Sequence, residues 1–257
     1  MTSPNSLWLF EIYAFAVGLC VGSFLNVVIY RLPLGASIVK PGSHCPMCGS
    51  PVRPYDNIPL VSWIVLLGLC RDCGASISPR YFFVELITGT LTWAVARVYG
   101  MDVSALLFML FVWSLVAVTF IDLDHQIIPD EITLGGAVAG LAVSHFLPLG
   151  FYGSAIGLLV GGGIFFLIAV VTPGGMGGGD IKLMAAIGAF TGWKQALLTI
   201  ILGSALGAVV GLFMIALFGR GRKDKIPFGP FLAIAAVISV LWGNGIINAY
   251  LEMAFRG

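Results

Sequence analysis

The sequence predicts an all-α polytopic membrane protein with about eight transmembrane helices. Of its 257 residues, 59% are hydrophobic and only 10% are charged, and the mean hydropathy is +1.02. A soluble domain carries about 25% charged residues, so we expect the core of this chain to lie between membrane spans surrounded by lipid. The net charge of +1 gives no reason to expect nucleic acid as a partner.

The first predicted helix covers residues 7–30, which are apolar except for Glu11 and a few small polar residues. At about 1.5 Å per residue, this segment is long enough to cross a hydrocarbon core of about 30 Å. No basic residue precedes it and no small-residue cleavage site follows it, so we interpret it as a retained signal anchor. Residues 1–30 therefore form the first predicted domain.

Residues 31–79 interrupt the apolar pattern and are predicted to fold outside the membrane as a second domain. This insert is rich in Pro, Gly and Ser and holds four of the five cysteines. Its apolar stretch at 60–69 is too short to span a bilayer. That stretch forms either the small core of the insert or a segment in the membrane interface.

Seven further helices are predicted in residues 80–257, the third domain. The apolar sequence after Asp180 is interrupted at 191–194 by Thr-Gly-Trp-Lys, and we divide it there into a short helix and a full one. The predicted helices cover residues 81–99, 103–121, 132–147, 152–171, 181–191, 195–218 and 228–253.

The distribution of Lys and Arg predicts the orientation of these helices. If the spans alternate, the loops at 31–80, 122–131, 172–182 and 219–227 share one side and carry ten of the thirteen basic residues. The positive-inside rule makes that side cytoplasmic. Two crossings must then lie between Asp180 and the basic loop, yet residues 181–191 extend only about 17 Å. Either this helix is partly unwound, or Asp180 lies below the membrane surface in a pit that water can reach.

The glycine-rich stretch 174–180 ends in the carboxylate of Asp180 and lies between two apolar segments. An acid at the edge of a membrane span is costly and indicates a functional site. Irregular backbone at that depth is tolerated only inside protein or beside water. The glycines, including Gly177, Gly178 and Gly179, would allow Asp180 and a substrate backbone to approach closely.

A second group of acids lies in the loop 121–130, which has three carboxylates and no Lys or Arg. Asp122 falls at the C-terminal end of a span, where the helix dipole disfavours an anion. Asp130 follows Pro129 and is interpreted first as the N-cap of the next helix. Asp124 is interpreted as a surface residue of the turn, and both Asp124 and Asp130 are candidate contacts for a basic substrate segment.

Asp122 and Asp180 are predicted to lie on the same face of the membrane, each at a helix end. Two neighbouring carboxylates share one proton. The ionised member can take a proton from water while the protonated member polarises a carbonyl, which is the chemistry of an aspartyl protease. The alternative is a membrane transport or ion-binding protein in which the two acids bind an ion or relay protons.

Four cysteines of the insert form two CxxC pairs, each followed by glycine. Four thiolates suit a tetrahedral metal ion, and disulfides are disfavoured in a reducing cytoplasm. We expect zinc, although iron can occupy the same geometry. The metal would stabilise an insert too small to have much core. The four predicted ligands are Cys45, Cys48, Cys70 and Cys73.

These motifs, in this order, resemble the type IV prepilin peptidases, membrane aspartyl proteases of the GxGD class. Gly177-Gly178-Gly179-Asp180 matches GxGD, and 122–130 matches a DxDxxxxPD segment whose first Asp is the partner acid in that family. The segments 22–33, 56–59 and 78–85 resemble its N-terminal and cytosolic signatures.

The resemblance implies a bacterial inner-membrane enzyme with Asp122 and Asp180 as catalytic residues facing the cytoplasm. It implies cleavage of the short basic leader of prepilins and pseudopilins, the substrates of type IV pilus and type II secretion systems. It also implies N-methylation of the new terminal residue with S-adenosyl-L-methionine as the methyl donor. No residues are assigned to binding of that donor.

Overall fold

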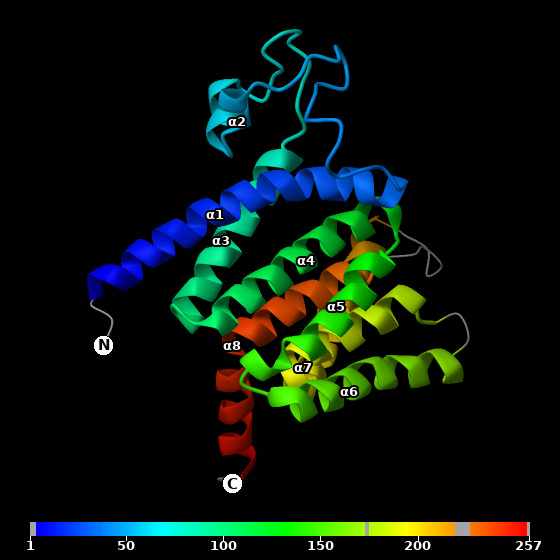
Figure 1. The fold of residues 1–257 in the computed structure, drawn as a ribbon. Helices are drawn as coiled ribbons and strands as arrows, with labels where there is room; N and C mark the ends of the chain where they lie inside the picture. Colours follow the sequence, from blue (N-terminus) through cyan, green and yellow to red (C-terminus); the bar gives the residue numbers. More distant parts are fainter. Residues whose placement is uncertain (1–3, 173–174, 219–226, 256–257) are drawn as a thin grey trace. The chain divides into compact units, whose positions relative to one another are not determined.

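The computed structural model describes residues 4–172, 175–218 and 227–255. Within these ranges it contains eight α-helices and no β-strand (Figure 1). Residues 219–226 of the predicted basic loop 219–227, and Gly174 of the glycine-rich stretch, lie outside the described residues. The chain divides into two compact units, residues 1–117 and 118–257, which are described separately.

The first unit is built on α1 (Pro4–Arg31) and α3 (Arg80–Tyr99), which pack along one another. Close approach depends on glycine, since a Cβ on Gly22 would lie 2.6 Å from Cα of Glu85. At one end of the pair, Arg97 donates to Glu11 at 2.9 Å. The unit also contains the first part of α4 (Val103–His125), where Nε1 of Trp113 donates to Thr92 at 2.8 Å.

The insert between α1 and α3 consists mainly of loops, as the sequence predicted. It contains the 3-10 turns η1 (Leu32–Leu34) and η2 (Pro54–Asn57) and the single-turn helix α2 (Val61–Val65). Figure 1 shows it on the side of α1 away from most of α3, at the end where α3 begins.

The second unit is organised around α7 (Gly178–Phe218), which packs against three other helices. They are α5 (Asp130–Ala142), α6 (Gly150–Val171) and α8 (Gly229–Phe255); the 3-10 turn η3 (Ser144–Phe146) precedes α6. The predicted division of α7 is found at Gly192, whose φ of 81° and ψ of 172° interrupt the helix. Beyond it, Thr199 donates to Ser239 of α8 at 3.0 Å.

The predicted all-α membrane fold is confirmed. Five described helices are long and apolar enough to cross a membrane: α1, α4, α6, α7 and α8. All eight predicted segments are helical, but the two after Asp180 form one kinked helix. The segment predicted at 132–147 is shorter, because α5 ends at Ala142 and a 3-10 turn follows.

The crossing of α6 and α7 provides the first testable prediction. A Cβ on Gly157 would collide with the carbonyl oxygen of Gly188, so Gly157→Ala forces two backbones apart. We expect a loss of about 1–3 kcal/mol, typical of overpacking, measured as a lower midpoint of thermal unfolding in detergent. Gly163→Ala on the same helix is the control, because a Cβ there meets nothing within 4 Å. Equal midpoints for the two variants would contradict the predicted close crossing.

Candidate active site and metal centre

Two helix ends of the second unit carry the two predicted acids, and a third helix end contacts one of these acids. Asp122 lies in the last turn of α4, and Asp180 lies in the first turn of α7. The third end is the start of α8 at Gly229. Two of these ends are helix N-termini, where backbone N–H groups and the helix dipole favour a negative charge.

Asp122 is buried, with 5% of its surface exposed. Its Oδ2 accepts a hydrogen bond of 3.0 Å from the backbone N–H of Gly229, at the start of α8. The sequence indicated an unfavourable position for this anion at the end of its own helix. The N-terminus of α8 supplies the compensating interaction, which also fixes the direction in which the carboxylate points.

Asp180 is half-buried and lies against the glycine that precedes its helix. A Cβ built on Gly177 would be 2.9 Å from Oδ2 of Asp180, and the backbone of Gly177 donates a hydrogen bond to this carboxylate. The carboxylate of Asp122 lies close enough for its charge to act on that of Asp180. The structure thus brings near one another the two acids that the sequence paired.

Ile128 packs between the two helix starts that carry this site. Its Cδ1 would be 3.2 Å from a Cβ on Gly229, and its Cβ would be 3.0 Å from a Cβ on Gly179. Both glycines are therefore needed for close packing around one side chain. The sequence analysis did not identify Ile128 or Gly229, although Gly-Pro directly before an apolar segment is a signal for a helix start.

Gly229 gives a second prediction. In Gly229→Ala, the added Cβ would lie 2.7 Å from Oδ2 of Asp122 and displace that carboxylate. A displacement of about 1 Å in a catalytic group can reduce a rate on the order of 100-fold, and we expect a loss of that size in peptide-bond cleavage. Gly245→Ala, on the exposed part of α8, is the matched control. Wild-type turnover in Gly229→Ala would show that the position of Asp122 is not critical.

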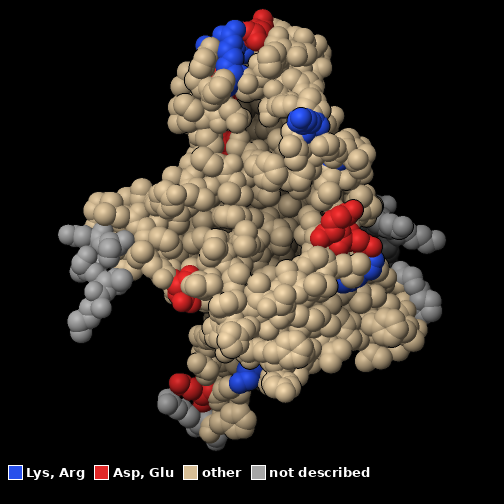
Figure 2. Space-filling model, viewed as in Figure 1, with Lys and Arg blue, Asp and Glu red and all other residues tan. Residues whose placement is uncertain are grey.

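The other acids of the loop are exposed. Figure 2 shows acidic side chains gathered over the junction of α4 and α5, where Asp124, Asp130 and Glu131 are exposed. The prediction that Asp130 caps α5 is wrong, because the N-cap is Pro129 and makes no side-chain cap. Asp130 instead pairs with Lys182 of α7 at 2.7 Å. This ion pair joins α5 to α7 two residues after Asp180.

The four predicted metal ligands meet in the insert. Their sulfur atoms all lie within 4.8 Å of one another, and Sγ of Cys45 is 3.9 Å from Sγ of Cys73. Tetrahedral zinc with Zn–S bonds of about 2.3 Å separates its sulfurs by about 3.8 Å, so the cluster fits zinc. All four positions would be filled by thiolates, which is typical of a structural site.

Each CxxC pair forms the same tight turn. The N–H of Gly49 donates to the carbonyl of Cys45, and that of Gly74 donates to the carbonyl of Cys70, both at 2.9 Å. The two glycines have φ of 72° and 69°, a conformation that favours glycine. The two turns are therefore near copies that present their sulfurs to one point.

Backbone donors prepare some of these thiols for metal binding. Hydrogen bonds from the side chain and backbone of Ser50 lower the pKa of the Cys48 thiol to about 6. Backbone hydrogen bonds from Cys73 and Asp72 likewise lower the pKa of Cys70. The thiolate is the form that binds metal, so these hydrogen bonds favour the ligand state at two of the four positions, whereas burial and the neighbouring thiols raise the pKa of Cys73 to about 12.

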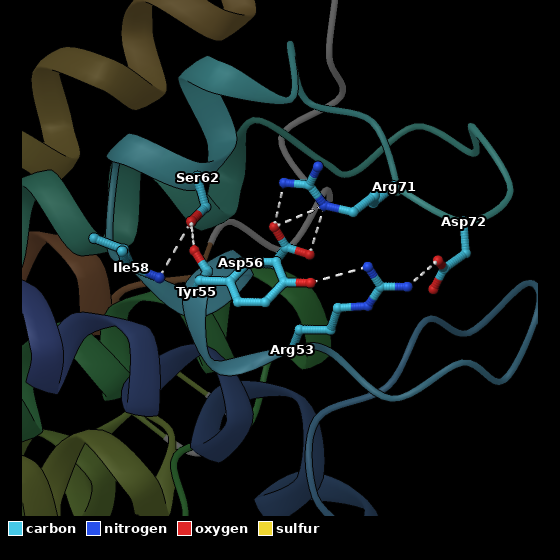
Figure 3. Close-up of polar contacts among 7 residues, drawn as sticks. All are labelled: Arg53, Tyr55, Asp56, Ile58, Ser62, Arg71 and Asp72. Atoms are coloured by element: carbon cyan, nitrogen blue, oxygen red, sulfur yellow. Dashed lines mark hydrogen bonds and ion pairs between the residues drawn. The ribbon is translucent and has the colours of Figure 1, made fainter.

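A network of polar contacts joins the two turns (Figure 3). Arg71, inside the second turn, makes hydrogen bonds to both carboxylate oxygens of Asp56, one of them 2.6 Å long. Arg53, after the first turn, contacts the Tyr55 hydroxyl at 2.9 Å and Asp72 at 3.2 Å. These contacts connect the segments that carry the cysteines.

Two models of known protein families match successive parts of the chain. The model of the bacterial peptidase A24 N-terminal domain matches residues 16–99, and that of the type IV leader peptidase family matches residues 109–212. A protein of Pseudomonas aeruginosa named prepilin leader peptidase/N-methyltransferase is 40% identical over 95% of this chain and 94% of its own length. The chain belongs to the type IV leader peptidase family.

Other relatives of this family carry the same name. One from Aeromonas salmonicida is 39% identical over 95% of each chain, and one from Legionella pneumophila is 34% identical over 96% of each. No solved structure matches. The resemblance found in the sequence is thus confirmed, as is the expected class of enzyme, a peptidase with methyltransferase activity. The second family match contains both Asp122 and Asp180, and the first contains all four cysteines.

Proposed function

We propose that this chain cleaves the leader peptide from prepilins and pseudopilins with Asp122 and Asp180 as the catalytic pair. The observation that carries this proposal is the arrangement of the two acids at adjacent helix ends, where one is oriented by the N–H of Gly229. The names of the relatives support the substrate class. Family membership gives no support to the alternative of an ion-binding or transport protein.

The proposed cleavage requires no covalent intermediate. One carboxylate takes a proton from a water molecule, and the resulting hydroxide attacks the scissile carbonyl carbon. The other carboxyl gives its proton to the carbonyl oxygen. When the intermediate collapses, the C–N bond breaks and the leaving amine receives a proton from the acid that took one from water, while one hydroxyl of the intermediate returns its proton to the other carboxylate. The pair ends with one shared proton, as it began.

The distribution of Lys and Arg supports a site at the cytoplasmic face of the bacterial inner membrane. The proposed domains follow from this placement: a first membrane helix at 1–30, the cysteine insert at 31–79 and the protease core at 80–257. In the insert, Cys45, Cys48, Cys70 and Cys73 would hold zinc, with iron as the alternative, and the ion would stabilise the fold.

N-methylation of the new N-terminus is the second part of the proposal. It is supported by the names of the relatives. S-adenosyl-L-methionine would supply the methyl group. We assign no residue of this chain to that step.

One experiment tests both activities. The chain is co-expressed with a prepilin, and the mass of the pilin N-terminal peptide is measured. Loss of the leader together with the added mass of one methyl group is the expected result. A pilin that keeps its full leader beside well-expressed chain would overturn the proposed cleavage, and a cleaved but unmodified terminus would overturn the methylation.

The acidic patch at the α4–α5 junction is proposed to receive the basic leader. Asp124 and Asp130 are exposed beside the catalytic pair, although Asp130 already pairs with Lys182. If these charges attract the leader, reversing the leader charge from basic to acidic should raise KM with little change in kcat. Equal kcat/KM for both leaders would remove these two residues from the proposal.

A further inference from the structure

The short helix α2 exposes one apolar face. Val61, Ile64 and Val65 occur at positions i, i+3 and i+4 and are 53%, 55% and 69% exposed. Leu67 follows and is 81% exposed, with a φ of 51° that residues with branched side chains rarely adopt. The backbone conformation of Leu67 belongs to the end of the helix, where the N–H of Gly68 donates to the carbonyl of Trp63 at 2.8 Å. Packing within the described chain does not account for the exposure of the apolar face.

The opposite side of α2 is attached to the beginning of α3. The ring of Trp63 packs on Phe82 with centroids 5.4 Å apart, and its Nε1–H donates to the carbonyl of Ile77 at 3.3 Å. The N–H of Leu60 donates to the buried carboxylate of Glu85 at 2.8 Å. These contacts fix both the position of α2 and the direction in which its apolar face points.

This attachment places α2 beside the end of the α1–α3 pair from which the insert emerges. Nδ2 of Asn26, near the end of the candidate span in α1, donates to the carbonyl of Tyr81 at 3.3 Å. Aromatic side chains are exposed at the same end of the helix pair: Tyr30 by 64%, Tyr81 by 44% and Phe83 by 53%. Aromatic residues concentrate at the boundary between the hydrocarbon core and water.

We propose that α2 lies in the membrane interface, with Val61, Ile64 and Val65 in contact with phospholipid. Lipid fits better than a protein partner because a stable protein interface needs about 20–30 residues on each side, far more than this face offers. Residues 31–80 also carry five Lys or Arg and only two Asp, a balance that favours anionic headgroups. Contact with lipid would hold the cysteine insert against the membrane.

The test uses photo-cross-linking in the full chain. p-Benzoylphenylalanine is incorporated at position 65 in one variant and at position 39 in another, and each is reconstituted into vesicles of phosphatidylcholine and phosphatidylglycerol. Val39 is the matched control, because it is an apolar residue of the same insert with 76% exposure and lies outside α2. After irradiation, we expect mass spectrometry to show phospholipid attached at position 65 in at least fivefold excess over position 39.

Equal lipid attachment at the two positions, or attachment at 65 mainly to another protein chain, would overturn the proposal. A second measurement uses a fluorescent amino acid at the same positions and brominated phosphatidylglycerol as the quencher. Stronger quenching at 65 than at 39 is expected, and equal quenching would count against membrane contact. Zinc content is measured in each variant to verify that the insert remains folded.

Discussion

Asp180→Asn is expected to reduce leader cleavage by on the order of 1,000-fold or more. The amide has nearly the shape of the carboxyl group but cannot accept and return a proton, so the acid–base step is lost. Asp122→Asn should have a similar effect, although its amide oxygen can still accept the hydrogen bond from Gly229. Cleavage is measured as a first-order rate with reconstituted enzyme and a prepilin substrate.

The double variant distinguishes a catalytic pair from two separate contributions. Residues that act as one unit have non-additive effects, so Asp122→Asn with Asp180→Asn should be no slower than either single variant. Glu131→Gln is the control for removal of an exposed acid near the site. Cleavage at the wild-type rate by either single variant would contradict the proposed mechanism, provided that the thermal unfolding midpoint is unchanged.

The sequence identified Asp122 and Asp180 because an ionised carboxylate is energetically unfavourable at both positions. An acid in a base-free loop predicted to be cytoplasmic and an acid after a run of glycines each require a physical reason, and a common membrane face was the predicted one. Their proximity depends on how α4, α7 and α8 converge. That convergence is a tertiary property, with no local signal in either motif.

The residues that support the pair were harder to predict. Gly229 lies 107 positions after Asp122, and only the folded chain brings its N–H to that carboxylate. In the sequence, nothing distinguishes Ile128 from other apolar residues. Its role is visible only in the structure, where it lies between two glycines of different helices. The sequence around Asp130 matches a common capping pattern, but its carboxylate instead forms an ion pair with Lys182. In each case a long-range contact decided the outcome.

The boundaries of the helices also could not be predicted fully from local sequence. Gly192 was correctly located as an interruption, since Thr-Gly-Trp-Lys breaks the apolar run. Whether such a break separates two helices or bends one depends on packing on both sides. Here the second half of α7 continues against α8 through Thr199 and Ser239, so the helix resumes directly.

Removal of the metal is expected to unfold the insert while sparing part of the cleavage activity. The two cysteine turns are joined by exposed polar contacts and little apolar core, so the ion should supply much of their stability. The proposed catalytic acids belong to the second unit, which has its own packed helices. Cys45→Ser should therefore lose bound metal and show faster hydrogen exchange in residues 43–78, with cleavage reduced less than methylation.

Cys20→Ser is the matched control, because Cys20 lies on α1 outside the cluster and should leave metal content and exchange unchanged. Elemental analysis of the purified wild-type chain is expected to give about one zinc per chain, and iron instead would identify the alternative ion. If Cys45→Ser lost cleavage and methylation to the same extent, the insert would be required for the protease core itself. The separation of roles between the two units would then be wrong, because the metal-bound insert would have to support the position of Asp122 or Asp180.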